Sequence, residues 1–312
     1  MNFENYKYRH MKRTFFFKIL LYLSFLFLVY YLYKFDYLKV TGLKFNYLYL
    51  FFSVLFLWLG FYLSTLSWWF ILKKHHINVS KSMALSSHGL SVFAKYIPGK
   101  IWVILGRAAK ASGNLYSVKT ASYASLKEQL LYVWEGLLLG WIPLLIYRGV
   151  DKYSLAIFLT ILFITFFNFS DKVRIFIIKI IKKIFKKELD IPHISFKENI
   201  NILLYIFVYW AAWIIAFYFL ALSVFPETSL NIGFVFPLSV TLGLLAVFVP
   251  GGIGVREGIM TAFMVLSGIP AEIAATISII SRLWFISGET FIFFFGFFVN
   301  KRMTENTEIL SG

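Results

Sequence analysis

Residues 248–254 read FVPGGIG, in which a proline is followed by three glycines within four positions. A related turn, KYIPGK, occupies residues 95–100, and the two prolines, Pro98 and Pro250, lie 152 positions apart. Proline and glycine interrupt helices, so each stretch predicts a bend between two short helical arms. Either turn alone is weak evidence, because both residue types also occur as kinks within membrane helices.

The rest of the chain repeats at the same offset. A shift of 152 positions places the apolar segment 46–72 on 198–224, and the segment 117–147 on 269–299. Duplicated units with a broken helix at their centre are typical of secondary transporters. The predicted organisation is one integral membrane domain, 1–312, with repeat unit one (46–147), a linking helix and basic amphipathic segment (148–197) and repeat unit two (198–299).

Composition excludes a soluble protein. Of the 312 residues, 60% are hydrophobic, 21% aromatic and 15% charged, whereas soluble domains have about 45–50% apolar and about 25% charged residues. The chain has no cysteine, and its five histidines show no ligand spacing, so neither a metal nor a cofactor is predicted. The net charge of +16 does not indicate a nucleic-acid partner, because the basic residues flank apolar segments and form no recognition module.

A helix needs about 20 apolar residues to cross a membrane. Six segments meet this length: 14–34, 46–72, 117–147, 152–169, 199–224 and 270–299. Segments 80–112 and 231–268 contain the Pro-Gly turns, and their arms of about 12–15 residues reach only ~18–22 Å against a ~30 Å core. We therefore predict an all-α polytopic membrane protein with six full transmembrane helices and two re-entrant or short-helix hairpins. If the hairpin arms also cross, the helices number eight or more.

The distribution of charge predicts the orientation. With the N-terminus in the cytoplasm, 20 of the 31 lysines and arginines fall on the cytoplasmic side, five fall outside and six lie at membrane depth. The positive-inside rule then places both termini in the cytoplasm. An odd number of crossings separates the two units, so we expect an inverted repeat whose Pro-Gly tips approach each other near the midplane.

Ten charged residues lie at membrane depth, where each costs about 2.5–3.5 kcal/mol on insertion scales. They are Lys95, Lys100, Arg107, Lys127, Arg256, Arg282, Glu128, Glu135, Glu257 and Glu289. Unpaired, they would cost about 25–35 kcal/mol, more than a fold can carry. They must therefore form pairs or line a wet cavity. Glu128 and Glu135 are seven positions apart, as are Arg282 and Glu289, so each pair shares a helix face that is predicted to point inward.

The cations predict an anion site, because six of them accompany four carboxylates at this depth. Glycine amides at the start of a half-helix also favour an anion. The predicted residues for binding a phosphate group are Lys100, Arg107, Arg256, Arg282, Gly99, Gly251, Gly252 and Gly254. The predicted charge partners or proton carriers are Glu128, Glu135, Glu257 and Glu289. Salt bridges that only lock the repeats together are the alternative for these glutamates.

The motifs resemble those of a flippase-like, UPF0104-like integral membrane family named after the transmembrane region of lysylphosphatidylglycerol synthase. The resemblance covers nearly the whole chain and rests on residues 95–100, Gly106-Arg107, PGGIGVREG at 250–258 and Ser281-Arg282. Members of this family are thought to translocate polar lipids, including aminoacylated phospholipids, and several occur with cell-envelope glycan genes. The resemblance implies a lipid flippase, not an enzyme, in a bacterial or archaeal plasma membrane. The chain ends at Gly312 without an aminoacyl-transferase domain, so aminoacylation is not implied.

The expected function is a lipid translocase that moves a phosphate-containing polar lipid or a polyprenyl-linked glycan in cell-envelope biogenesis. The membrane lipid is then its partner, with envelope-synthesis enzymes as further candidates. Two alternatives stay open. One is a membrane glycosyltransferase with a polyprenyl-phosphate donor, for which Asp36 is the candidate carboxylate in an outer loop. The other is a non-transporting partner in envelope assembly.

Overall fold

The chain folds as a bundle of long helices. The computed structural model describes residues 44–97, 101–113, 115–170, 196–246, 252 and 254–311, with single residues of the N-terminal region and of 172–179. The helices long and apolar enough to span a membrane are α2 (Tyr47–Lys74), α5 (Val118–Arg148), α6 (Lys152–Phe169), α8 (Phe196–Val224) and α11 (Ala271–Ser311). These ranges contain no strand. Five predicted spans and the all-α polytopic class are confirmed, while span 14–34 and the basic amphipathic segment lie largely outside the described residues.

Local sequence determines where the long helices begin and end. The Asn46 side chain accepts hydrogen bonds from two backbone amides in the first turn of α2. Helix α5 ends at Gly149, whose φ of 67° suits glycine. Asp151 then caps α6, and the hydrogen bond from the Ser154 amide lowers the pKa of this carboxyl. The cap therefore stays ionised at neutral pH, which favours the sharp return of the chain from α5 to α6.

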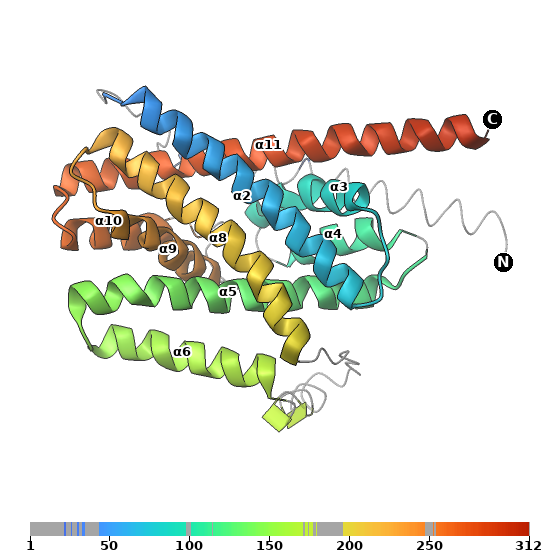
Figure 1. Ribbon diagram of the computed structural model, residues 1–312, viewed down its shortest axis with the longest axis horizontal. Helices are drawn as coiled ribbons and strands as arrows, with labels where there is room; N and C mark the ends of the chain where they lie inside the picture. The colour runs from blue at the N-terminus through green and yellow to red at the C-terminus, as the bar shows by residue number, and fades with distance from the viewer. Residues whose placement is uncertain are drawn as a thin grey trace.

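Each Pro-Gly stretch separates two short helical arms, as predicted. The first hairpin consists of α3 (Lys81–Ser91), η1 (Val92–Tyr96) and α4 (Trp102–Ser112). The second consists of η2 (Leu230–Phe234), α9 (Val235–Leu245) and α10 (Val255–Leu266). The turn residues 98–100, 247–251 and 253 lie outside the described residues. Figure 1 shows one hairpin in each half of the bundle, which is the arrangement expected of hairpins that enter from opposite sides.

Corresponding helices of the two units run in opposite directions (Figure 1). Shifting α2 by 152 positions gives 199–226, close to the bounds of α8. The two helices are antiparallel neighbours, since the Ser53 hydroxyl donates to the Ala216 carbonyl oxygen (2.7 Å). These directions agree with the inverted repeat, while the division of the domain into units stays a prediction.

The two hairpins interlock with the long helices. The second arm of each hairpin packs on the long helix of its own unit, α4 on α5 and α10 on α11. The first arm crosses the long helix of the other unit, α3 on α11 and α9 on α5. Both crossings use glycine, because a Cβ at Gly89 would meet the Ile292 carbonyl oxygen and one at Gly140 would overlap the Leu238 backbone. This exchange brings the two hairpins together between α5 and α11.

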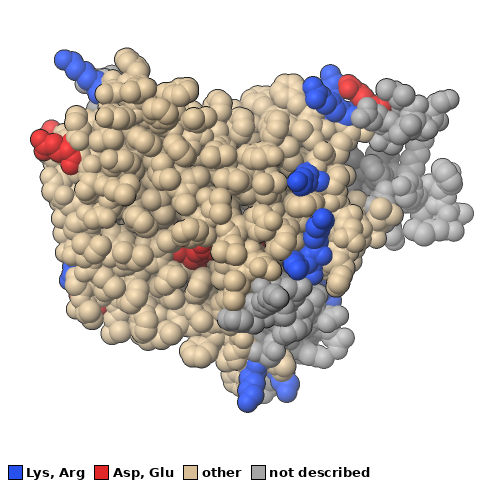
Figure 2. Space-filling model, in the orientation of Figure 1, with Lys and Arg blue, Asp and Glu red and all other residues tan. Residues whose placement is uncertain are grey.

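Charge is concentrated at the ends of the bundle. Figure 2 shows most of the basic side chains of this face at the end where α2 finishes, and an almost uncharged surface between the two ends apart from one recessed acidic group. Lys73, Lys119 and Lys301 are basic residues that the helix directions place at that end. The uncharged middle is the part that a bilayer would cover.

Candidate functional site

A cavity of about 180 Å³ lies between the two hairpins. The lining residues from the first half of the chain lie on α2, α3, η1, α4 and α5. Those from the second half lie on α8, α9, α10 and α11. Both predicted repeat units therefore contribute residues to one cavity. The tips of the hairpins lie outside the described residues, so their predicted meeting near the midplane stays a prediction.

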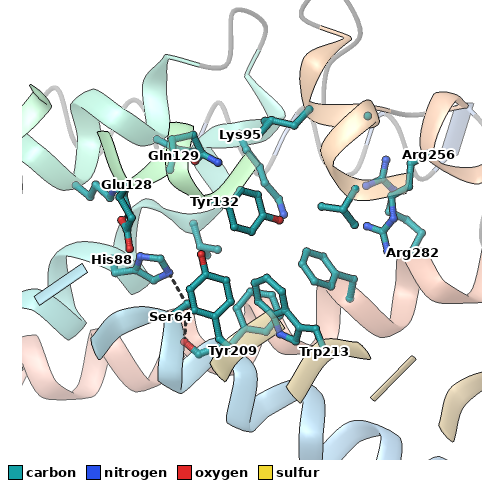
Figure 3. A pocket seen from close by; sticks show the side chains of 18 residues that line it. Ser64, His88, Lys95, Glu128, Gln129, Tyr132, Tyr209, Trp213, Arg256 and Arg282 are labelled. Atoms are coloured by element: carbon teal, nitrogen blue, oxygen red, sulfur yellow. Dashed lines mark hydrogen bonds and ion pairs between the residues drawn. The ribbon is translucent and has the colours of Figure 1, made fainter. Parts of the chain in front are cut away.

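Four cations line the cavity: Lys95, Arg107, Arg256 and Arg282. In Figure 3 Arg256 and Arg282 lie on one side, Lys95 extends toward the centre, and Glu128 lies on the opposite side. The structure therefore brings together three arginines that the sequence indicated. Lys95 was recognised as a charge at membrane depth but not as a site residue.

Arg107 is held by residues of its own repeat unit. Its Nη1 lies 2.6 Å from Glu128 Oε2, its Nε donates to Ser125 Oγ (2.5 Å) and its Nη2 donates to the Ser125 carbonyl oxygen (2.9 Å). Its guanidinium also covers the ring of Trp68, 4.2 Å from the centroid. The charge of Arg107 is thus balanced, and Glu128 acts as the charge partner that the sequence predicted for this helix.

Lys95 joins the two repeat units. It forms an ion pair with Glu289 of α11, whose other oxygen accepts a hydrogen bond from the Tyr96 hydroxyl (2.8 Å). The Glu289 side chain is fully buried, whereas that of Lys95 is 28% exposed. This contact fits the alternative stated for the glutamates, a salt bridge that links the repeats.

Glu257 connects the start of α10 to α11. One carboxylate oxygen lies 3.3 Å from Arg282 Nε, and the other accepts a hydrogen bond from the Gly254 amide (2.7 Å). Gly254 has a φ of 82° and Gly252 one of 66°, and a Cβ at Gly252 would collide with Gly243. The Gly254 amide is thus occupied by Glu257, and Gly252 allows the two arms to approach closely. Gly99, Lys100 and Gly251 lie outside the described residues, and ligand contact by any of these residues stays a prediction.

Arg256 differs from the other three cations. Its side chain is buried, with 3% of the residue exposed, and its guanidinium lies 5.0 Å from the Phe236 centroid and 4.9 Å from that of Phe285. Nη2 donates to the Ser281 carbonyl oxygen at 3.4 Å, and Nε has no hydrogen-bond partner. In the described part of the chain no carboxylate pairs with it. Arg256 is therefore the cavity cation that forms no direct ion pair among the described residues, although the neighbouring Glu257 interacts with it electrostatically.

Glu135 is the predicted charge partner that the structure leaves without a cation. It is 5% exposed, shares the face of Glu128 on α5, and its Oε2 has no hydrogen-bond partner. Among the described residues it forms no ion pair. All four predicted glutamates are therefore buried, but only three of them balance a basic side chain.

Sequence reasoning missed the polar and aromatic part of the wall. The missed lining residues are Ser64, His88, Gln129, Tyr132, Tyr209 and Trp213. Tyr132 stacks on Trp210 with 4.5 Å between ring centroids, and the spacing of four from Glu128 was a signal that could have placed it on the same face. Gln129 lies on α5 next to Glu128, and the others come from α2, α3 and α8, where no local pattern separates cavity residues from ordinary packing.

Comparison with known proteins agrees with the resemblance in the motifs. The family model of the lysylphosphatidylglycerol synthase TM region matches residues 15–286. A UPF0104 membrane protein of Pyrococcus horikoshii is 24% identical over 258 residues, covering 69% of this chain and 76% of that protein. No solved structure matches the chain. The matched range contains the four cavity cations and both Pro-Gly stretches.

Proposed function

Because this chain belongs to the family of the lysylphosphatidylglycerol synthase TM region, we propose that it is a lipid translocase. It moves a phosphate-containing polar lipid or a polyprenyl-linked glycan across the plasma membrane. The phosphate binds in the cavity between the hairpins. The single observation that carries this proposal is Arg256, a buried guanidinium at membrane depth whose Nε is unbonded and which forms no ion pair with any described carboxylate.

The surroundings of Arg256 favour phosphate as its partner. A buried charge is stable only when an opposite charge or several hydrogen bonds compensate it. The planar guanidinium binds two phosphate oxygens at once, which a lysine ammonium cannot do. Phe236 and Phe285 fix the position of the guanidinium, and Lys95 and Arg282 add positive potential to the same cavity. A group with one negative charge and several acceptor oxygens is therefore the best occupant.

The size of the cavity limits which part of the lipid enters it. A cavity of about 180 Å³ is small compared with pockets that enclose a whole drug-sized ligand, which measure about 300–1,000 Å³. This space suits a phosphate-bearing headgroup, whereas acyl or prenyl chains must stay in the hydrocarbon core. A lateral opening toward the bilayer is therefore part of the proposal. The fold family supports a lipid as substrate, since its name refers to a synthase of a phospholipid.

The cellular setting belongs to the same proposal. We place both termini in the cytoplasm, which is supported by the basic side chains at the end of the bundle where α2 finishes (Figure 2). Envelope-synthesis enzymes are the proposed protein partners. Asp36, the carboxylate on which the glycosyltransferase alternative depends, lies outside the described residues. Product formation in detergent, where no two sides exist, separates an enzyme from a translocase.

The test is lipid movement in proteoliposomes that contain the purified protein alone. Fluorescent phosphatidylglycerol serves as the probe, and a quencher that cannot cross the membrane reports which leaflet holds it. Arg256→Gln should lower the rate at least tenfold while the protein still inserts into the membrane. Arg148→Gln is the matched control, because Arg148 is exposed and pairs with Asp151 in a loop. Wild-type movement by Arg256→Gln refutes the role of Arg256, and no movement by the wild type favours an assembly partner.

A further inference from the structure

Glu135 is a buried carboxylate without compensation in the middle of a membrane helix. The other three membrane glutamates each have a cation, Glu128 with Arg107, Glu257 with Arg282 and Glu289 with Lys95. Glu135 is 5% exposed, its Oε2 lacks a hydrogen-bond partner, and no ion pair reaches it within the described ranges. Glu135 has no role in the proposed phosphate site.

Its position lies next to the wall of the cavity. Tyr132, one helical turn before Glu135, lines the cavity, and so does Glu128 two turns before it. The following residue, Gly136, lies against Trp210 of α8 and Thr241 of α9. Glu135 therefore stands where α5 meets both a long helix of unit two and the first arm of its hairpin.

The helices around α5 bring no counterion to Glu135. Helix α9 and η2 contain no titratable residue, and α6 contains none beyond Lys152 and Tyr153 in its first turn, at the far end of the helix pair formed by α5 and α6. From α8, Tyr209 interacts electrostatically with both Glu128 and Glu135. From α4, Arg107 is already paired with Glu128, and Lys110 lies in the last turn of the helix and forms no ion pair with Glu135.

The remaining neighbours are also accounted for. From α2, His75 lies beside Tyr123, three turns before Glu135 on α5. On α5 itself, Lys127 donates hydrogen bonds to Asn168 of α6. No basic side chain of the described residues, Arg256 of the cavity included, thus forms an ion pair with Glu135.

An isolated carboxylate in an apolar environment is far more stable with a proton bound than without one. We propose that Glu135 carries a proton at neutral pH, and that its uptake and release couple lipid movement to the proton gradient. In the uptake step, water on one side of the membrane supplies the proton and an O–H bond forms on the carboxylate. In the release step, that bond breaks and the proton passes to water on the opposite side. This coupling rests on the proposed lipid translocation, and Tyr209 provides the link between Glu135 and the cavity.

The first experiment examines the proton and needs no transport. Infrared difference spectra of the purified full chain across a pH titration should show a protonated carboxyl group at neutral pH that is missing in Glu135→Gln. The matched control is Glu227→Gln, since Glu227 lies exposed in the loop after α8. If the neutral carboxyl signal is absent from the wild type, or persists in Glu135→Gln, the proposal is overturned.

The second experiment examines the coupling. Proteoliposomes carry fluorescent phosphatidylglycerol as the lipid probe and a pH-sensitive dye in the lumen, with a hundredfold proton gradient imposed. The wild type should change its lipid flux about tenfold with the gradient and move protons with the lipid. Glu135→Gln should move lipid at one rate with or without the gradient and move no protons. Lipid movement by the wild type that ignores the gradient overturns the coupling while it supports the translocase. If the wild type moves no lipid, the translocase fails, and the coupling fails with it even where the infrared signal is present.

Discussion

The ion pair between Lys95 and Glu289 predicts how strongly the two repeat units are held together. Glu289→Gln removes the negative charge but keeps an oxygen that accepts the hydrogen bond from the Tyr96 hydroxyl. Removing one partner of a buried ion pair costs about 3–5 kcal/mol, because the other charge stays buried. Lys95 is 28% exposed, so water screens part of that cost. We therefore expect a loss near the lower end, about 3 kcal/mol in the free energy of unfolding.

A double-mutant cycle separates the charge from the side chain. In Lys95→Met with Glu289→Gln both charges are gone, and the loss should fall to about 1 kcal/mol, because a buried ion pair replaced on both sides is often near neutral. The coupling energy is then about 2 kcal/mol. Reversible unfolding in mixed micelles with increasing sodium dodecyl sulfate gives each free energy.

The control pair lies at the far end of α11. Lys301 and Glu305 are 3.8 Å apart and their side chains are 66% and 54% exposed, so Glu305→Gln should cost less than about 0.5 kcal/mol. The reasoning is refuted if Glu289→Gln costs no more than Glu305→Gln. It is also refuted if the double variant is as unstable as Glu289→Gln, because the loss would then not come from a stranded charge.

Two further predictions concern packing and orientation. Gly140→Val places a branched side chain against the α9 backbone, so it should greatly lower the yield of folded protein in detergent. Gly258→Val is the control and should leave the yield unchanged, because a Cβ at Gly258 meets nothing within 4 Å. Equal yields of the two variants would contradict the close crossing of α5 and α9. The natural chain has no cysteine, so Val150→Cys and Arg302→Cys can be labelled without background, and an impermeant maleimide should reach the first from outside and the second from the cytoplasm. Labelling of both from one side would contradict the predicted orientation.

Much of the fold was predictable because the bilayer imposes it. The thickness of the hydrocarbon core fixes the length of a crossing helix, and four predicted spans match helices to within a few residues, while the fifth helix, α11, continues twelve residues beyond its predicted end at 299. The Pro-Gly turns predicted the broken hairpins for an equally local reason, since neither residue continues a helix well. The exchange of arms between the units could not be predicted, because it depends on contacts such as Gly89 with α11 that have no counterpart in neighbouring sequence.

The site was predictable as a set of charges but not as a set of pairs. Arg107, Arg256 and Arg282 could be chosen because a charged residue at membrane depth is energetically costly and usually marks a functional site. The spacing of seven suggested that Arg282 and Glu289 act on the same side, yet Arg282 pairs with Glu257 and Glu289 pairs with Lys95. These partners are set by the crossing of η1 and α10 on α11. The aromatic wall was hidden for another reason, since one residue in five of this chain is aromatic and most of these rings face lipid or ordinary core.

The charge pairs of the two units also explain why positive charge lies mainly on one side of the cavity. In unit one the second arm supplies the base and the long helix the acid, Arg107 with Glu128, whereas unit two reverses this order, Glu257 with Arg282. A repeat with identical charges would give a cavity whose two sides are alike. The reversal, together with the unpaired Arg256, gathers cations beside α10 and α11 and leaves Glu128 on the opposite side (Figure 3). An anionic group therefore has one favoured position in the cavity, beside α10 and α11. The antiparallel arrangement of corresponding helices does not make the electrostatic potential symmetric, because that potential is set by the charged side chains.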